Sequence, residues 1–401
     1  MPAKRSGGEN IMITERPLNR RDFLKFTGAT AAGLAFASFA SSSAFAAAAG
    51  RRDAEMNILC WEGYNTENVL GPFRKLHPGI KLRAESAVSD PDMINKLRAG
   101  ETKVWDLINL NQCWARGQLW PDKLIKPLDR DRFDKYFEHM LPWFKGPNKY
   151  ALSPDGSELL GMVQRFGPFN FVVNTDKISK EFAEDQSFKL FLDPKMKGKY
   201  GLLAYDNWNI LHLCVAADLN PFVKHSEADI AAFTKVCKQI FSGAKLISGD
   251  LVQMNQALVN GEIDAYFTGG TYTSSPARLD GQKNVLAITP KKGPIDGKGG
   301  IQWFEVTSLV NNPEPTPRAS DFLEFVQKPE ICHAVAFAEG TYNPVSQMSD
   351  PKVFALFSKE ELDALQWDTI DRDMNLCADF EINPDNDRMM EIYNEVKRSR
   401  G

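Results

Sequence analysis

The chain has 401 residues, of which 43% are hydrophobic and 25% are charged, a balance typical of a globular protein with room for two domains. The formal net charge of −4 at pH 7 excludes the generally basic surface of a protein that coats nucleic acid. No long stretch after residue 55 is biased enough in composition to predict disorder.

The first 46 residues have the pattern of an export signal. Arg20 and Arg21 precede a short run of small apolar residues over 26–40, and residues 44–46 read Ala-Phe-Ala. Paired arginines before a weakly apolar run resemble the twin-arginine export signal, and an A-x-A triplet is typical of signal cleavage. The run is too short and too weakly apolar to span a bilayer. We therefore expect residues 1–46 to be a twin-arginine signal and the remainder to be a soluble, mildly acidic protein of the periplasm.

The first part of the remaining chain alternates strands and helices. Residues 56–61 are short and apolar, which predicts a strand, and a helix is expected over 65–76, where a proline and a glycine follow. A second strand is expected over 80–84. The next helix, over 89–100, begins with a capping serine and a proline in its first turn, and a third strand is expected over 105–110.

The same alternation recurs later in the chain. Strands are expected over 169–173, 200–205 and 262–267, and helices over 209–219 and 251–259. Strands that alternate with helices predict a mainly parallel sheet covered by helices on both faces. Two α/β lobes follow, with a ligand cleft outside the carboxyl ends of the strands.

The cysteines are scattered and contain no C-x-x-C pair, which argues against a zinc site. An oxidising compartment allows disulfides, although the spacing does not give their pairing. We expect most of the cysteines to be buried thiols that pack as small apolar groups, and we expect no metal or other cofactor. The six cysteines are Cys60, Cys113, Cys214, Cys237, Cys332 and Cys377.

Ordered pieces of the sequence over roughly residues 56–346 resemble the periplasmic spermidine/putrescine-binding proteins of polyamine importers. These pieces are Trp61-Glu62-Gly63-Tyr64, Ser89-Asp90-Pro91-Asp92-Met93 with Lys96-Leu97, Trp105-Asp106-Leu107, Lys126-Pro127-Leu128-Asp129, Asp193-Pro194 with Lys197-Gly198-Lys199, Gly261-Glu262-Ile263-Asp264, Trp303-Phe304-Glu305 and Gly340-Thr341-Tyr342-Asn343-Pro344.

The resemblance implies the periplasmic binding protein type II fold, with two hinged α/β lobes around a ligand cleft. Lobe 1 is expected to comprise residues 56–164 plus about 306–345, and lobe 2 residues 165–305 plus about 346–401. The partners implied are a small cationic solute and the membrane permease and ATPase subunits of an ABC importer. The protein itself is expected to be a monomer that binds no nucleic acid.

The resemblance also implies a set of ligand-binding side chains. Carboxylates would hold the ammonium groups of a putrescine- or spermidine-like polyamine, and aromatic faces would cover its methylene spacer. Trp303 and Glu305 alternate along a predicted strand and so share one face, whereas Glu62 is expected to be exposed. The expected ligand-binding residues are Trp61, Tyr64, Asn111, Trp114, Asp206, Phe267, Trp303, Glu305 and Tyr342.

Two alternatives stay open. Asn209 stands where polyamine binders carry an acid, so the same fold could take an amino-acid-like, opine or aminophosphonate solute, and Arg165 would then point into the pocket to meet its anionic group. An enzyme is the other alternative. The sequence has no G-x-S-x-G, H-E-x-x-H, P-loop or G-x-G-x-x-G motif, so we expect a binding protein without catalysis.

Overall fold

The computed structural model describes residues 52–86, 89–338 and 340–399, and the predicted signal lies outside these ranges. The strands of the described residues are β1 (Glu55–Cys60), β2 (Lys81–Ser86), β3 (Leu107–Asn111), β4 (Ile125–Lys126), β5 (Met162–Asn174), β6 (Tyr200–Leu203), β7 (Leu246–Ser248), β8 (Ala265–Gly270), β9 (Val285–Ile288), β10 (Gly300–Val310) and β11 (Cys377–Asp379). The helices are α2 (Glu67–Leu76), α3 (Asp90–Arg98), α4 (Gln112–Trp114), α5 (Arg130–Phe137), α6 (Lys180–Gln186), α7 (Asp206–Ala216), α8 (Glu227–Gly243), α9 (Leu251–Val259), α10 (Thr271–Leu279), α11 (Pro317–Phe325), α12 (Pro329–Ala336), α13 (Pro351–Phe354), α14 (Lys359–Ala364), α15 (Ile370–Asn375) and α16 (Asn386–Ser399).

The predicted elements near the start of the described chain are present with small shifts at their ends. Strand β1 pairs in parallel with both β2 and β3. Helix α3 begins where the sequence predicts, because the Ser89 side chain accepts a hydrogen bond from the backbone N–H of Asp92 at 3.2 Å. Helix α2 ends at Leu76, just before the predicted stop. Local capping signals therefore set these boundaries.

The sheet is mixed, which corrects the prediction of a mainly parallel sheet. Its strands follow the order β2-β1-β3-β10-β5-β8-β6-β7, with β4 and β11 also on β10 and β9 also on β5. Strand β10 is antiparallel to β3, β4 and β5, and β5 is antiparallel to β8 and β9. These antiparallel pairs join segments far apart in the chain, and no local pattern specifies them.

Strand β5 is much longer than the predicted segment 169–173. Its first half contains Gln164 and Arg165, which do not read as an apolar strand, yet every residue of β5 is buried. The Gln164 side chain donates to the backbone oxygen of Val326 at 2.7 Å, and Arg165 forms an ion pair with Glu305. Buried polar groups of this kind are tolerated because partners satisfy them.

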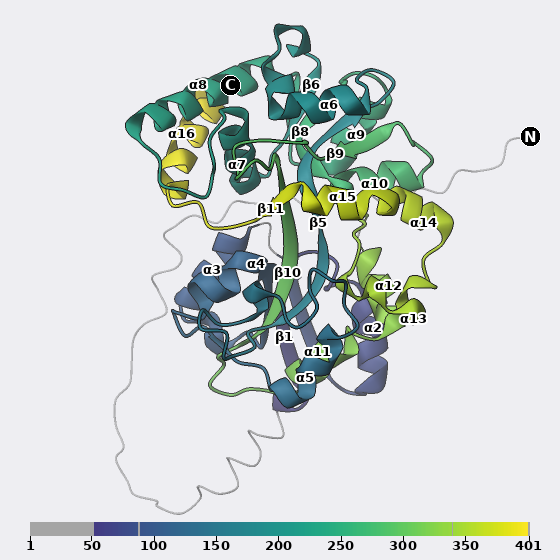
Figure 1. Cartoon of the computed structure of the whole chain (residues 1–401). Coiled ribbons are helices and arrows are strands. Elements are labelled where there is room, and N and C mark those ends of the chain that lie inside the picture. Colours follow the sequence, from purple (N-terminus) through teal and green to yellow (C-terminus); the bar gives the residue numbers. More distant parts are fainter. Residues whose placement is uncertain (1–51, 87–88, 339, 400–401) are drawn as a thin grey trace, which may run out of the picture. The chain divides into compact units, whose positions relative to one another are not determined.

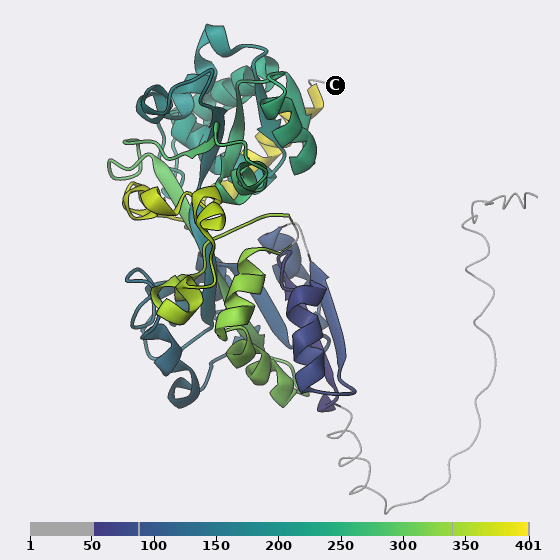
Figure 2. The ribbon, with the colours of Figure 1, turned by 90° about the vertical axis from the view of Figure 1, so that its right-hand side faces the viewer.

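Strands β5 and β10 connect two groups of helices (Figure 1). At one end of these strands α2 contacts α12, and Figure 2 shows these two helices side by side. At the other end α16 contacts α7 and α8, which come from the middle of the chain. The ring of Tyr393 on α16 packs against that of Phe241 on α8, with centroids 5.1 Å apart. The C-terminal helix is thus part of the second group.

The cysteines are buried thiols, as predicted, and none forms a disulfide within the described residues. Burial raises the pKa of the Cys214, Cys332 and Cys377 thiols, so they stay protonated. The helices of the described part are too short or too polar to cross a bilayer.

Candidate functional site

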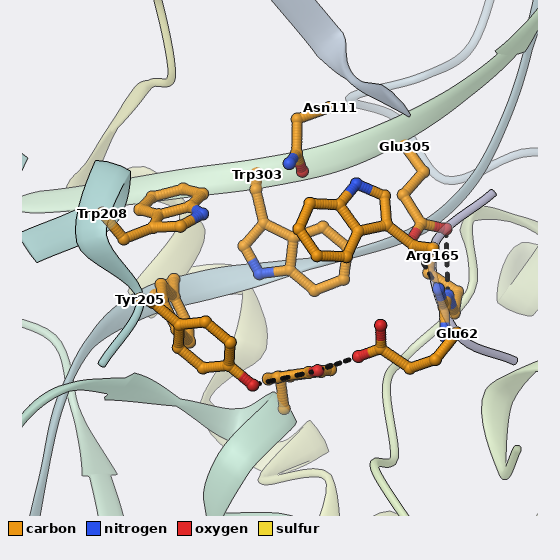
Figure 3. A pocket seen from close by; sticks show the side chains of 10 residues that line it. Glu62, Asn111, Arg165, Tyr205, Trp208, Trp303 and Glu305 are labelled. Atoms are coloured by element: carbon orange, nitrogen blue, oxygen red, sulfur yellow. Dashed lines mark hydrogen bonds and ion pairs between the residues drawn. The ribbon is translucent and has the colours of Figure 1, made fainter. Parts of the chain in front are cut away.

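An aromatic pocket lies where β5 and β10 pass between the two groups of helices (Figure 3). Apart from its residues on β5 and β10, its lining comes from the carboxyl ends of the parallel strands β1, β3 and β6 and from the first turns of helices α7 and α10. This is the edge where open α/β sheets bind ligands. The lining residues are Trp61, Glu62, Asn111, Arg165, Phe169, Tyr205, Trp208, Tyr272, Trp303 and Glu305.

Several aromatic rings of the pocket meet nearly at right angles. The Phe169 ring meets Trp208 at 73° and a centroid distance of 4.9 Å, and meets Tyr272 at 72° and 6.1 Å. Tyr272 in turn meets Trp303 at 84° and 6.2 Å. Rings in this edge-to-face arrangement are mutually stabilising.

A buried ion pair forms one end of the pocket. The Arg165 guanidinium donates through Nε to Glu305 Oε2 at 2.9 Å and through Nη2 to Oε1 at 2.5 Å. Tyr64 donates its hydroxyl to Glu305 Oε2 at 2.9 Å. The guanidinium carbon Cζ of Arg165 lies over the Tyr64 ring, 5.0 Å from the ring centroid. Arg165 is 1% and Glu305 2% exposed. Burial raises the pKa of Glu305, and Arg165 balances its negative charge.

Glu62 is a second carboxylate in the pocket, although the sequence analysis expected it to be exposed. Tyr272 donates its hydroxyl to Glu62 Oε1, and the Tyr205 hydroxyl lies 3.4 Å from that of Tyr272 (Figure 3). Burial raises the pKa of Tyr272, so its hydroxyl stays protonated and can donate. Within the described ranges no lysine, arginine or histidine forms an ion pair with Glu62. Its negative charge is therefore available to a ligand.

Asp90 positions one wall of the pocket from behind. It accepts hydrogen bonds from the indole nitrogens of Trp61 and Trp114, each at 2.8 Å, and from the Asn111 side chain at 2.7 Å. Asp90 is the first residue of α3 and is buried. Burial raises its pKa to about 6, against the lowering effect of Asn111, Trp61 and Trp114. The sequence analysis assigned it only a place at the helix start, and an acid at the positive end of a helix was the available signal.

The raised pKa of Asp90 has a consequence for stability. A carboxyl with a pKa of about 6 in the fold and 3.8 otherwise binds more protons folded than unfolded between these values, so stability should fall as pH rises from about 4 to about 6. We expect this loss to be roughly 2–3 kcal/mol and to be absent from Asp90→Asn. Urea unfolding at several pH values measures both slopes. Equal slopes for the two proteins would contradict the assignment.

Four residues of the predicted set line the pocket: Trp61, Asn111, Trp303 and Glu305. Tyr64 and Trp114 lie directly behind them, and their polar atoms contact Glu305 and Asp90, not the pocket. The structure thus places both in a supporting position.

Asp206, Phe267 and Tyr342, also in the predicted set, lie outside the lining of this pocket. Asp206 accepts hydrogen bonds from Lys397 at 3.0 Å and from Tyr393 at 2.9 Å, so it ties α7 to α16. The Phe267 ring is fully buried on the core side of β8, 5.4 Å from Phe188 and 5.2 Å from Phe191. The Tyr342 ring packs on Phe337 at 5.0 Å.

Several lining residues were absent from the predicted set. Phe169 lies on β5, Tyr205 and Trp208 at the start of α7, and Tyr272 in the first turn of α10. Their signal was positional, since Tyr205 ends a predicted strand and Trp208 and Tyr272 each lie in the turn or helix start that comes after a predicted strand. Arg165 was predicted to face the pocket only under the alternative in which the ligand is a zwitterion. It reaches the pocket, where it pairs with Glu305, whereas Asp206 pairs with Lys397.

The N-terminus matches the model of the twin-arginine translocation pathway signal sequence over residues 17–37. No curated protein matches the chain by sequence. Solved structures do match, at low identity.

A protein of Listeria monocytogenes described as a spermidine/putrescine ABC transporter is 19% identical, with a TM-score of 0.65 over 86% of this chain and 98% of that one. The spermidine/putrescine ABC transporter substrate-binding protein PotD of Streptococcus pneumoniae is 15% identical, with a TM-score of 0.61 over 86% and 99%. The periplasmic binding protein MotA of A. tumefaciens B6, solved with glucopine, is 14% identical, with a TM-score of 0.58 over 86% and 99%. The protein is therefore exported, and it has the mixed α/β fold of the periplasmic binding proteins of ABC transporters.

Proposed function

We propose that this protein is the solute-binding component of an ABC importer and that it captures a small organic cation in the aromatic pocket. The observation that carries the proposal is a pocket walled by aromatic faces with one carboxylate, Glu62, that has no cationic partner in the described structure. Aromatic faces and a half-buried carboxylate both favour a positive charge. Permease and ATPase subunits would be its partners, and no catalytic step is required.

The two lobes expected from the sequence belong to the same proposal. Glu62 follows β1 and Tyr272 begins α10, so the hydrogen bond between them joins the two groups of helices across the pocket. A ligand that contacts both groups stabilises the arrangement in which they lie close together, by its difference in affinity for the two arrangements. The membrane subunits would recognise that closed arrangement.

A zwitterionic solute is a second candidate, and one observation favours it. Arg165 Nη1 is buried without a hydrogen-bond partner among the described residues. A carboxylate on the solute, as in an opine, could accept from this nitrogen while its ammonium group faces Glu62. A buried donor left unsatisfied is costly, so a ligand acceptor here would add affinity.

Binding to a panel of solutes tests the proposal. We expect organic cations or zwitterions, among them putrescine, spermidine, choline and an opine, to raise the midpoint of thermal unfolding, because a ligand at 100 times its Kd adds about 2.7 kcal/mol of stability. Sugars and dicarboxylates of similar size should have no effect. A panel in which only anions or neutral solutes stabilise the protein would overturn the proposal.

The role of Glu62 can be tested against a matched carboxylate. Glu62→Gln should weaken the binding of a cationic solute about tenfold or more, because it removes a charge-assisted contact. Asp206→Asn is the control, since Asp206 pairs with Lys397 outside the pocket. Isothermal titration of both variants measures the difference. A loss of affinity in Asp206→Asn with none in Glu62→Gln would place the cation elsewhere.

A further inference from the structure

Resting on the proposed function, we infer that the group recognised by the pocket is a quaternary ammonium, in place of the primary ammonium groups of a polyamine. The inference depends on the balance of charges, on the hydrogen-bond acceptors of the pocket and on the orientation of its rings.

The charges of the pocket suit a ligand with one positive charge. Glu305 is balanced by Arg165 through two hydrogen bonds, which leaves Glu62 as the lining carboxylate without a cationic partner in the described structure. A diamine brings a second ammonium group. That group would lie in the pocket without an anion, and an unpaired buried charge is strongly disfavoured.

The pocket is also poor in acceptors. A primary ammonium carries three N–H donors that need acceptors when buried. One Glu62 oxygen already accepts from Tyr272, which leaves the other Glu62 oxygen, the Asn111 side-chain oxygen and the Tyr205 hydroxyl as acceptors. These are fewer than the two ammonium groups of a diamine require. Both oxygens of Glu305 accept from Arg165. A quaternary ammonium has no N–H group and needs none of these acceptors.

The aromatic walls supply what a quaternary ammonium requires. Its charge is spread over methyl groups, which pack against ring faces and are attracted to them electrostatically. These four rings all line one space, and the near-perpendicular contacts of Phe169 with Trp208 and of Tyr272 with Trp303 set their planes at different angles around it. Figure 3 shows Trp208 on one side of that space and Glu62 on the other. A methylated cation between them contacts the rings and lies near the carboxylate.

Choline and its neutral carbon isostere, 3,3-dimethylbutan-1-ol, test the inference on the unaltered protein. The two have nearly the same shape and differ in charge. We expect choline to bind at least about tenfold more tightly than the isostere, as a cation held by aromatic faces should, and more tightly than putrescine or spermidine. Isothermal titration and tryptophan fluorescence measure these affinities. Glycine betaine serves as a further arm: tighter binding than choline would place its carboxylate on Arg165, and weaker binding would favour a simple cation.

A variant pair assigns the effect to the rings. Trp208→Leu keeps an apolar side chain and should weaken choline about tenfold, while the affinity for the isostere changes less. Trp367→Leu is the matched control, because Trp367 packs on Phe354 outside the pocket. If Trp208→Leu does not fold, the comparison of choline with its isostere decides.

The outcomes separate the two proposals. Putrescine or spermidine binding as tightly as choline overturns the inference and leaves the proposed function standing. Equal affinity for choline and its isostere also overturns it. If no organic cation or zwitterion binds, both proposals fail.

Discussion

Glu305→Gln is expected to lower the free energy of unfolding by about 3–5 kcal/mol. The Arg165 guanidinium is 1% exposed and hydrogen-bonds to both carboxylate oxygens of Glu305. Glutamine at position 305 removes the negative charge that balances Arg165, and the arginine cannot relieve the imbalance by losing its proton. Chemical unfolding followed by tryptophan fluorescence measures the loss.

Two further variants make this expectation specific. Glu67→Gln disrupts the exposed pair with Arg74 and should cause no measurable loss, since exposed pairs contribute little. The double variant Arg165→Met/Glu305→Gln removes both charges and should be more stable than Glu305→Gln alone. If Glu305→Gln is as stable as Glu67→Gln, the buried pair does not have the role described.

Gly270→Ala is expected to lower stability by about 3 kcal/mol, the upper end for overpacking. A Cβ at Gly270 would lie 2.3 Å from the backbone oxygen of Pro168 and 3.0 Å from Phe169 Cα. Backbone atoms of paired strands cannot move aside as a flexible side chain can, so β8 would have to separate from β5. Ligand affinity should fall as well, because Phe169 and Tyr272 lie on either side of this contact.

Gly249→Ala is the control for this substitution. A Cβ at Gly249 would meet nothing within 4 Å, so neither stability nor affinity should change. Thermal unfolding measures the stability of both variants, and titration with a cation that binds the unaltered protein measures their affinity. Full stability in Gly270→Ala would show that the two strands separate more easily than their packing indicates.

The elements that were predicted correctly are those whose positions depend on residues close together in the sequence. Ser89 caps α3 and an apolar run forms β1, so both could be located from residues within one turn or strand. The direction of β5 and β10 could not, because each pairs with strands distant in the chain. Arg165 in β5 even opposes the strand pattern, and only its pairing with Glu305 makes its burial possible.

The site was predicted to the correct segments but not always to the correct residue. At the start of α7 successive side chains point in different directions around the helix. Asp206 therefore faces Lys397 on α16, while its neighbours Tyr205 and Trp208 line the pocket. On β8 the side chain of Phe267 points to the core, and the pocket receives Tyr272 from the helix that follows. The sequence alone predicts which loop borders the pocket, whereas the direction of each side chain depends on the residues that pack against it.

The thiols described above bear on where this protein can fold. The chain needs no oxidant to reach its native state, because the described fold contains no disulfide and its cysteines are buried. Folding can therefore be complete in the reducing cytoplasm, before the twin-arginine signal directs the protein outward. On the oxidising side of the membrane the same enclosure keeps these thiols from forming wrong cross-links.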